Sequence, residues 1–536
     1  MNIFEKYDRN FIHIIFISLI PIFILFTANF GKINFYDLIF PIVLITGISL
    51  SCYFILKRKF SKNKIALIIS IILIMIFSYG HIYNIFSQIN ISDIDLGRTR
   101  YIIPITVIPG IIGIILIIKS KSKFSDSNKI LNVVSLVIFL VIISNLLIAT
   151  LNNFDCDNCI NTEFFYESRD FSNYFQDFNY NLENNMILPN VYYLILDEYA
   201  RKDALKEYHD FDNSEIIKFL ESKGFHVADK SFSNYPMSVQ SIPATMNMDY
   251  INFLQNEIGK DVRNYKPLNE KDFGLYANNE VIKNFKEIGY NIVTFNTFSL
   301  HPYTIPLSDL VLCERQVDLL NNKLIDSLAR MSIFGYFVER WGEAEQRKVT
   351  KCALDEFPTI SQKINSPFFV WAHVLLPHPP WIFGPNGEEI TPGKPLILTD
   401  NPEYRDSGWD PKLQYIQQLE FSNKNIKNIV NQIFEIDPYS IIIIQGDHGT
   451  GWDINWNNPS DKDKFQRLRN FDAIYFPDES KRNVLNNERT LVNTFRLVFN
   501  EYFNSDYQIL ENKMYWGTNN EPYSFANVTN SINKMN

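Results

Sequence analysis

The C-terminal part of this chain lacks an excess of basic residues. The whole sequence of 536 residues carries a net charge of -9. Residues 1–150 contain 14 Lys and Arg against 6 Asp and Glu, whereas residues 151–536 contain 36 against 53. A nucleic-acid-binding face needs clustered positive charge to meet the phosphates. The balance argues against nucleic acid as a partner, and it indicates that the two parts of the chain work in different surroundings.

Charged residues are almost missing from five apolar stretches near the N-terminus. These stretches cover residues 11–29, 36–56, 65–87, 101–118 and 130–151. A helix needs roughly 20 apolar residues to cross a bilayer, and five stretches in series are more than a cleavable signal peptide contains. The sequence therefore predicts a five-helix transmembrane domain over residues 1–151. A chain of this length is also expected to contain at least one further domain.

The connections between these stretches differ in their basic residues. Eleven Lys and Arg precede the first stretch or lie in the second-to-third and fourth-to-fifth connections. The alternate connections hold only Lys32, Arg98 and Arg100. Because basic loops stay on the cytoplasmic side, we expect a cytoplasmic N-terminus. Five crossings of the cell membrane then place the chain from residue 152 onward on the extracytoplasmic side.

Cysteine is scarce, with five residues in the chain. Cys156 and Cys159 form an isolated CxxC after the last apolar stretch, where a zinc site would lack two ligands. Disulfides are compatible with the extracytoplasmic side. We therefore expect Cys156 to pair with Cys159 and Cys313 with Cys352, and a zinc site at the CxxC is the alternative.

Short apolar runs alternate with helical patterns in the rest of the chain. Residues 152–188 show no clear period and are predicted to be a linker, followed by a catalytic domain over residues 189–536. The expected strands are 190–196, 225–231, 290–296, 367–376, 441–444 and 471–477, and the expected helices are 214–223, 279–288, 320–345, 412–434 and 488–503. This alternation predicts an α/β domain with a mostly parallel central sheet that helices cover on both faces.

Acidic residues directly follow two of these strands. Asp197 and Glu198 end the run NVYYLIL, and Asp447 and His448 follow IIIIQG. Ligands bind at the carboxyl ends of strands in open α/β sheets, and these residue types hold divalent metals. The second pair lies between glycines that would let the backbone approach a ligand. The two pairs predict a metal site; the alternatives are a helix N-cap at the first pair and a polar turn at the second.

A hydroxyl and two histidines extend this set of polar residues. Pro236 precedes a stretch that can start a helix, so Ser238 is expected near a helix N-terminus, where backbone N–H groups favour an anion. That position suits a hydroxyl nucleophile that attacks phosphorus. His378 lies between prolines at a third strand end, and His373 lies within that strand. The alternatives are an N-cap at Ser238 and a structural role for His378.

The acid pair, the hydroxyl, the histidine and the Asp-His pair occur in an order that resembles the alkaline phosphatase and sulfatase superfamily. These motifs lie within residues 190–201, 233–247, 371–381 and 441–452. Five spanning helices ahead of an extracytoplasmic domain are similar, more narrowly, to the sulfatase-like group that includes lipoteichoic acid synthase and lipid A phosphoethanolamine transferase. The resemblance implies a sulfatase-like α/β fold for the catalytic domain.

The resemblance also implies a metal site in this chain. Asp447 and His448 would be ligands, and either or both of Asp197 and Glu198 would complete the site. The expected cofactor is a divalent metal, Zn or Mn, with Mg and Ca as further candidates.

Further roles follow from the same resemblance. Ser238 would be the nucleophile, and His378 would bind the substrate phosphate or assist the leaving group. Contacts with the substrate are expected from His373, Arg201 and Trp381.

Two features of the family are missing from this sequence. Sulfatases carry a C/S-x-P-x-R motif, whereas the second and fourth positions after Ser238 are Gln240 and Ile242. The transferases have a further histidine beyond the Asp-His pair, whereas His448 is the last histidine here. The first departure argues against sulfate ester hydrolysis. The second is compatible with a degenerate enzyme, one that lacks part of the family's site.

The expected function is that of a membrane-bound phosphotransferase. It would move a phosphoethanolamine- or phosphoglycerol-type head group from a membrane phospholipid to a cell-envelope glycan or lipid, through a covalent phospho-Ser238 intermediate. The alternatives are a phosphodiester hydrolase of the same superfamily and an inactive, membrane-anchored glycan-binding relative.

Overall fold

The chain divides into two compact units, each of which is described by itself. One comprises Met1–Asn161, Gln316–Gly342 and Gly393–Pro395, and the other comprises Thr162–Arg315, Glu343–Pro392 and Leu396–Asn536. The computed structural model describes residues 11–30, 33, 35–86, 90–91, 94–95, 99–154, 172–182, 187–258, 274–297, 305–314, 322–390, 410–456, 458–517, 521 and 523–536.

Five apolar helices form most of the first unit, as the sequence predicts. They are α1 (Ile12–Ala28), α2 (Ile39–Leu56), α3 (Lys62–Phe86), α4 (Thr99–Lys119) and α5 (Ser125–Phe154). Four of them are long and apolar enough to cross a bilayer, whereas α1 has 17 residues and is shorter. Apolar side chains such as Val137 and Ile112 face outward. Helices that are hydrophobic all round belong in a membrane, so this part of the chain is membrane-embedded.

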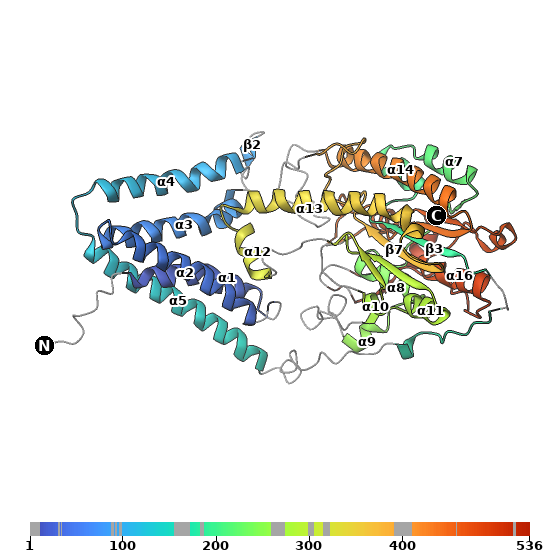
Figure 1. Ribbon diagram of the computed structural model, residues 1–536, viewed down its shortest axis with the longest axis horizontal. Helices are drawn as coiled ribbons and strands as arrows, with labels where there is room; N and C mark the ends of the chain where they lie inside the picture. Colours follow the sequence, from blue (N-terminus) through green and yellow to red (C-terminus); the bar gives the residue numbers. More distant parts are fainter. Residues whose placement is uncertain are drawn as a thin grey trace. The chain divides into compact units, whose positions relative to one another are not determined.

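Helix α1 is the centre of this unit. It packs against α2, α3 and α5, while α3 packs against α4 (Figure 1). Ile14, Ile22 and Phe26 on α1 are fully buried among these helices. His13 is buried as well, and its backbone N–H donates to Asn132 Oδ1 on α5 at 2.7 Å.

A seven-stranded sheet forms the centre of the second unit. Its order is β4-β9-β8-β3-β7-β5-β6. The strands are β3 (Asn190–Leu196), β4 (His226–Val227), β5 (Asn291–Phe295), β6 (Leu310–Leu312), β7 (Phe368–Val374), β8 (Ser440–Gly446) and β9 (Asp472–Tyr475). Strands β8, β3, β7, β5 and β6 run parallel, while β9 and β4 are joined by antiparallel pairings. The predicted mostly parallel sheet is confirmed.

Both faces of this sheet are buried, because successive side chains along each strand point alternately into two apolar cores. On β3, Leu194 and Leu196 contribute to one core, and Tyr193 and Ile195 contribute to the other. The first core is covered by α6 (Lys202–His209), α7 (Ser214–Ser222), α13 (Gly335–Glu356) and α14 (Pro411–Ile436), and the second by α8 (Ser238–Met246), α11 (Glu280–Ile288) and α16 (Thr494–Phe503). Figure 1 shows α7 and α14 on one side of β3 and β7, and α8 and α11 on the other.

The predicted helix over residues 320–345 is wrong. Two helices, α12 (Lys323–Arg330) and α13, are separated by a turn. The turn is closed by the Gly335 N–H, which donates to Ser332 O at 2.8 Å. A Cβ at position 335 would lie 2.2 Å from Arg330 O. Glycine therefore permits a tight reversal that the helical period of the sequence conceals.

One of the two expected disulfides is confirmed. Cys313 and Cys352 are bonded to each other and connect the end of β6 to α13. Cys156 and Cys159 lie outside the described residues. Cys52 on α2 is a free thiol.

Candidate metal centre

Three neighbouring strands end at one edge of the sheet. β3 pairs in parallel with β7 and β8, and the register aligns Leu196 with Val374 and with Gly446. Aligned parallel strands bring the residues that follow them to the same edge. Asp197 follows β3, and Asp447 and His448 follow β8. The polar residues that the sequence places at separate strand ends therefore meet in space.

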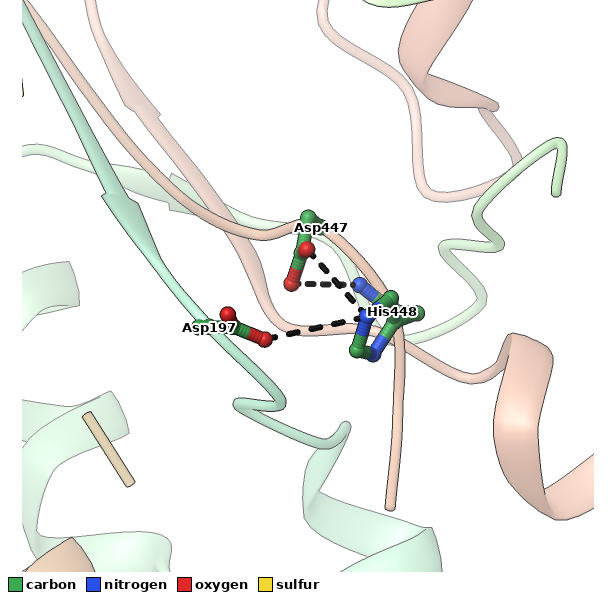
Figure 2. Close-up of side chains that lie close together, drawn as sticks. All are labelled: Asp197, Asp447 and His448. Atoms are coloured by element: carbon green, nitrogen blue, oxygen red, sulfur yellow. Dashed lines mark hydrogen bonds and ion pairs between the residues drawn. The ribbon is translucent and has the colours of Figure 1, made fainter. Parts of the chain in front are cut away.

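Asp197, Asp447 and His448 point toward one another at this edge (Figure 2). One possible ligand atom from each residue lies within 4.8 Å of the others, and all three side chains are buried. His448 Nε2 lies 3.2 Å from Asp447 Oδ2 and 3.7 Å from Asp197 Oδ1. Two carboxylates and an imidazole in this arrangement can hold a divalent cation.

The surroundings of the carboxylate oxygens fit such an ion. Asp447 Oδ1 accepts hydrogen bonds from the backbone N–H of His448 at 3.0 Å and of Glu198 at 3.1 Å. Within the described part of the chain, Asp447 Oδ2 and Asp197 Oδ1 are buried and accept no hydrogen bond. A buried carboxylate oxygen without a partner costs free energy. A cation between these two oxygens would offset that cost.

Histidines surround the carboxylate of Asp197. Burial by itself would raise the pKa of Asp197. The positive charge of His378, together with a hydrogen bond from His373 and its charge, outweighs burial and holds the pKa well below its usual range. His373 Nε2 lies 3.4 Å from Asp197 Oδ2. The aspartate is therefore ionised, as a metal ligand must be.

Ser238 lies next to the same histidine. It is the first residue of α8, so the predicted helix start is confirmed. Its Oγ lies 3.0 Å from His448 Nε2. The other ring nitrogen of His448, Nδ1, lies 3.1 Å from Gly449 O, which fixes the tautomer with a proton on Nδ1. His448 Nε2 is then the unprotonated nitrogen that faces both the carboxylates and the hydroxyl.

Glu198 does not join this group, although it follows Asp197 directly. Its backbone has φ +64°, in the left-handed region that a non-glycine residue rarely adopts. Its Oε1 accepts from the Gly451 N–H at 2.6 Å and from Arg467 Nη1 at 3.0 Å. The strained turn directs this fully buried carboxylate toward the loop after β8. Of the two acids expected at the metal, the structure brings Asp197 to the cluster.

Arg467 is a site residue that sequence reasoning missed. It lies in α15 (Asp461–Leu468), is buried, and connects three segments of the site. Its Nε donates to Pro236 O at 2.7 Å, its Nη1 donates to Gly449 O at 3.0 Å, and its Nη2 lies 3.2 Å from His448 Nε2. Because β9 runs antiparallel to β8, the residues before it lie at the same edge as Asp447. An antiparallel assignment of β9 would have provided the signal.

The remaining predicted residues occupy different places. His373 lies beside Asp197, as described above, and the backbone N–H of His378 donates to Asp197 O at 3.2 Å. Trp381 is buried, and its indole N–H donates to Pro377 O at 3.2 Å, so it supports the His378 loop. Arg201 is paired with Asp203 at 2.7 Å and donates to Ser231 O. The structure does not bring Arg201 to the metal ligands.

A neutral histidine packs against the loop after β8. His209, at the end of α6, has its Nε2 2.9 Å from Thr450 Oγ1 and packs beside the rings of Trp452 and Tyr415. Burial, followed by the positive charge of Lys412, lowers the pKa of His209 to about 4. The ring is therefore uncharged at neutral pH.

The titration of His209 predicts a pH-dependent stability. Between pH 6.5 and about 4 the unfolded chain binds this proton and the folded chain does not. The free energy of unfolding should therefore rise with pH over this window. The contribution of His209 is fully present above pH 6.5, and below pH 4 the free energy of unfolding is lower by on the order of 3 kcal/mol. Thermal unfolding of the full-length protein in detergent should show a shallower slope in this window for His209→Gln. An unchanged slope would contradict the assignment.

The buried pair of Glu198 and Arg467 predicts strong coupling. Arg467→Met leaves the Glu198 carboxylate without its cation, which should cost about 3–5 kcal/mol of unfolding free energy. The double variant Glu198→Gln with Arg467→Met should recover a large part of that loss. Denaturant unfolding of the wild type, both single variants and the double variant measures the coupling. Additive losses would show that the two side chains do not depend on each other.

No model of a known protein family matches the chain, and no curated protein sequence matches it. Solved structures do resemble it. The C-terminal periplasmic domain of EptC from Escherichia coli, in complex with Zn, has a TM-score of 0.42 and 12% identity over 66% of this chain and 96% of that chain.

Two further structures extend the comparison. The integral membrane lipooligosaccharide phosphoethanolamine transferase A from Neisseria meningitidis has a TM-score of 0.38 and 12% identity, over 91% of this chain and 95% of that chain. The phosphonate monoester hydrolase of Agrobacterium radiobacter has a TM-score of 0.37 and 13% identity, over 61% and 80%. All three TM-scores are below 0.5. The function of this chain is therefore inferred from its own side chains. The three structures include a phosphoethanolamine transferase, the kind of enzyme that the sequence motifs resemble.

Proposed function

We propose that this chain is a metal-dependent, membrane-bound enzyme that transfers a phosphoryl-containing head group through Ser238. The observation that carries the proposal is the position of the Ser238 hydroxyl, 3.0 Å from His448 Nε2, beside the carboxylates of Asp197 and Asp447. A hydroxyl at a helix start and next to a cation site is an arrangement suited to phosphoryl transfer, because the backbone N–H groups favour an anion and a cation activates the hydroxyl. The donor is a membrane phospholipid, and the acceptor is a hydroxyl of a cell-envelope glycan or lipid.

Asp197, Asp447 and His448 would hold the divalent ion, for which we expect zinc or manganese. When bound, the ion lowers the pKa of a neighbouring hydroxyl and neutralises charge on a phosphoryl oxygen. The backbone N–H groups of His448 and Glu198 orient the carboxylate of Asp447. Arg467 is a positioning residue: it joins the loop of Ser238 to the loop of His448 through Pro236 O and Gly449 O.

The proposed reaction has two displacement steps at phosphorus. Ser238 Oγ gives its proton to solvent water as it forms a bond to the phosphorus of the phospholipid, and the bond from phosphorus to the diacylglycerol oxygen breaks. His378 gives a proton to this leaving oxygen; its Nδ1 donates to Pro379 O, so Nε2 is the ring nitrogen assigned to proton transfer. The acceptor hydroxyl then attacks the phosphorus of the phosphoserine and gives its proton to His378 Nε2, and Ser238 Oγ leaves and takes a proton from solvent water.

Metal binding tests the ligand set. We expect the purified full-length wild type to retain zinc or manganese after dialysis, and Asp447→Asn and Asp197→Asn to lose it, since each supplies a ligand oxygen. Mass spectrometry of the metal content measures this. The matched control is Asp437→Asn, because Asp437 accepts from Asn190 and Tyr192 at the amino end of the strands. Equal metal content in all four proteins would refute the proposed site.

The covalent intermediate tests the reaction. With a phospholipid labelled in its head group and extracted envelope glycan, rapid quenching should trap label on the peptide that contains Ser238. Ser238→Ala should remove that adduct and lower transfer on the order of a thousandfold or more, whereas Ser222→Ala, on the exposed side of α7, should not. Label found on glycan or lipid supports the transferase. Label found only in free head group would identify a hydrolase instead.

A further inference from the structure

A segment from the middle of the chain belongs to the membrane-embedded unit. Residues 316–342 are grouped with the apolar helices, although they lie between β6 and the later part of α13. Within this segment, Leu324 and Leu328 of α12 are buried. They lie in one apolar cluster whose other buried members are Ile22, Leu25, Phe26, Leu38 and Leu146. Helix α12 therefore packs on membrane helices through its apolar side.

The turn after α12 is joined to α3 by backbone hydrogen bonds. The Gly80 N–H donates to Met331 O at 2.9 Å, and the Ile333 N–H donates to Ile76 O at 3.0 Å. A Cβ at Gly80 would lie 2.7 Å from Met331 O and 3.2 Å from Met331 Cβ. The missing side chain at Gly80 is thus what allows the turn to approach the helix backbone.

These two contacts lie deep along α3. Ile76 and Gly80 come 14 and 18 residues after Lys62, where the helix begins. At about 1.5 Å per residue, they lie about 21 and 27 Å along the axis. The hydrocarbon core of a bilayer is about 30 Å thick. The contacts with Met331 and Ile333 therefore fall within the leaflet at the C-terminal end of α3.

The same turn and the start of α13 each present an aromatic side chain outward. Phe334 is 53% exposed and Phe337 is 67% exposed. Phe334 directly follows Ile333, which is bonded to α3, and Phe337 lies in the first turn of α13. In water such exposure of two phenyl rings would be unfavourable, whereas in a lipid leaflet it is favourable. Irregular backbone within a bilayer must pair its polar groups with protein, and the reciprocal bonds with Ile76 and Gly80 provide such pairs.

We propose that residues 322–342 form an interfacial anchor that inserts into the leaflet at the C-terminal end of α3. Phe334 and Phe337 on its outer surface contact phospholipid acyl chains. Its docking site on the protein is the backbone of α3 at Gly80. The Cys313–Cys352 disulfide closes the stretch of chain that contains the anchor. The inference depends on the membrane placement of α3 and does not depend on the proposed catalysis.

Photo-crosslinking in the full-length protein tests this proposal. Benzoyl-phenylalanine at position 334 or 337, in bilayers that contain labelled phosphatidylethanolamine and phosphatidylglycerol, should give lipid adducts after illumination. The positive control is position 137, where Val137 on α5 is 54% exposed, and the negative control is position 439, where Tyr439 of the other unit is 47% exposed. Adducts at 334 and 337 should match those at 137. Adducts no higher than at 439 would overturn the proposal.

A glycine substitution tests the docking site. Gly80→Ala places a Cβ against Met331 O and should lower the ratio of docked to undocked anchor by about fivefold or more. Lipid adducts at 334 should fall, and hydrogen exchange at Ile333 should accelerate. The matched control is Gly47→Ala on α2, where a Cβ would meet nothing within 4 Å. Equal adducts and equal exchange in both variants would rule out Gly80 as the docking site, and wild-type labelling at 334 remains an independent readout.

Discussion

The parallel pairing of β3 with β7 on one side and β8 on the other is the constraint on which the site depends. The register aligns Leu196 with Val374 and Gly446, so the three strands end at the same level. Each strand is buried on both faces. A register slip of one residue would exchange every side chain between the two apolar cores. Packing of the interior therefore fixes where Asp197 and Asp447 emerge.

The charges at this edge are balanced in a way that leaves a place for one divalent cation. The buried carboxylates of Asp197 and Asp447 lie close together, and they would repel each other in a medium of low dielectric constant. Arg467 neutralises Glu198 at 3.0 Å. Asp197 and Asp447 then carry two negative charges beside a neutral His448, which matches the charge of a divalent ion. Glu198 serves better as the partner of a buried guanidinium than as a third anionic ligand.

The sequence predicts much of the fold because its signals are local. Apolar length identifies the membrane helices, and polar residues at strand ends identify Asp197, Asp447 and His448. The choice between Asp197 and Glu198 could not be predicted, since it depends on a left-handed backbone turn at a residue that is not glycine. Arg467 could not be placed, because a mostly parallel sheet does not reveal that β9 runs antiparallel to β8.

Arg201 shows the limit of inference from a motif. It lies three positions after Glu198, within the stretch that carries the resemblance, and it was expected to contact the substrate. Its guanidinium is paired with Asp203, and Arg469 Nη1 lies 2.9 Å from the same carboxylate. Asp203 comes only two residues after Arg201 in the sequence, yet a side-chain pair of this kind has no periodic signature. The tertiary context of α6 decides the role of such a residue.

The glycines around the Asp-His pair lead to a further conclusion. The sequence suggests that they let the backbone approach a ligand. In the structure a Cβ at Gly446 would lie 2.2 Å from Tyr199 O, and a Cβ at Gly449 would lie 2.5 Å from Gln466 O. Both glycines thus allow the loop to pack against other backbone segments of the protein. Because the loop is held on both sides, Asp447 and His448, the proposed ligands between the glycines, are oriented in advance, and little ordering free energy would oppose the binding of an ion.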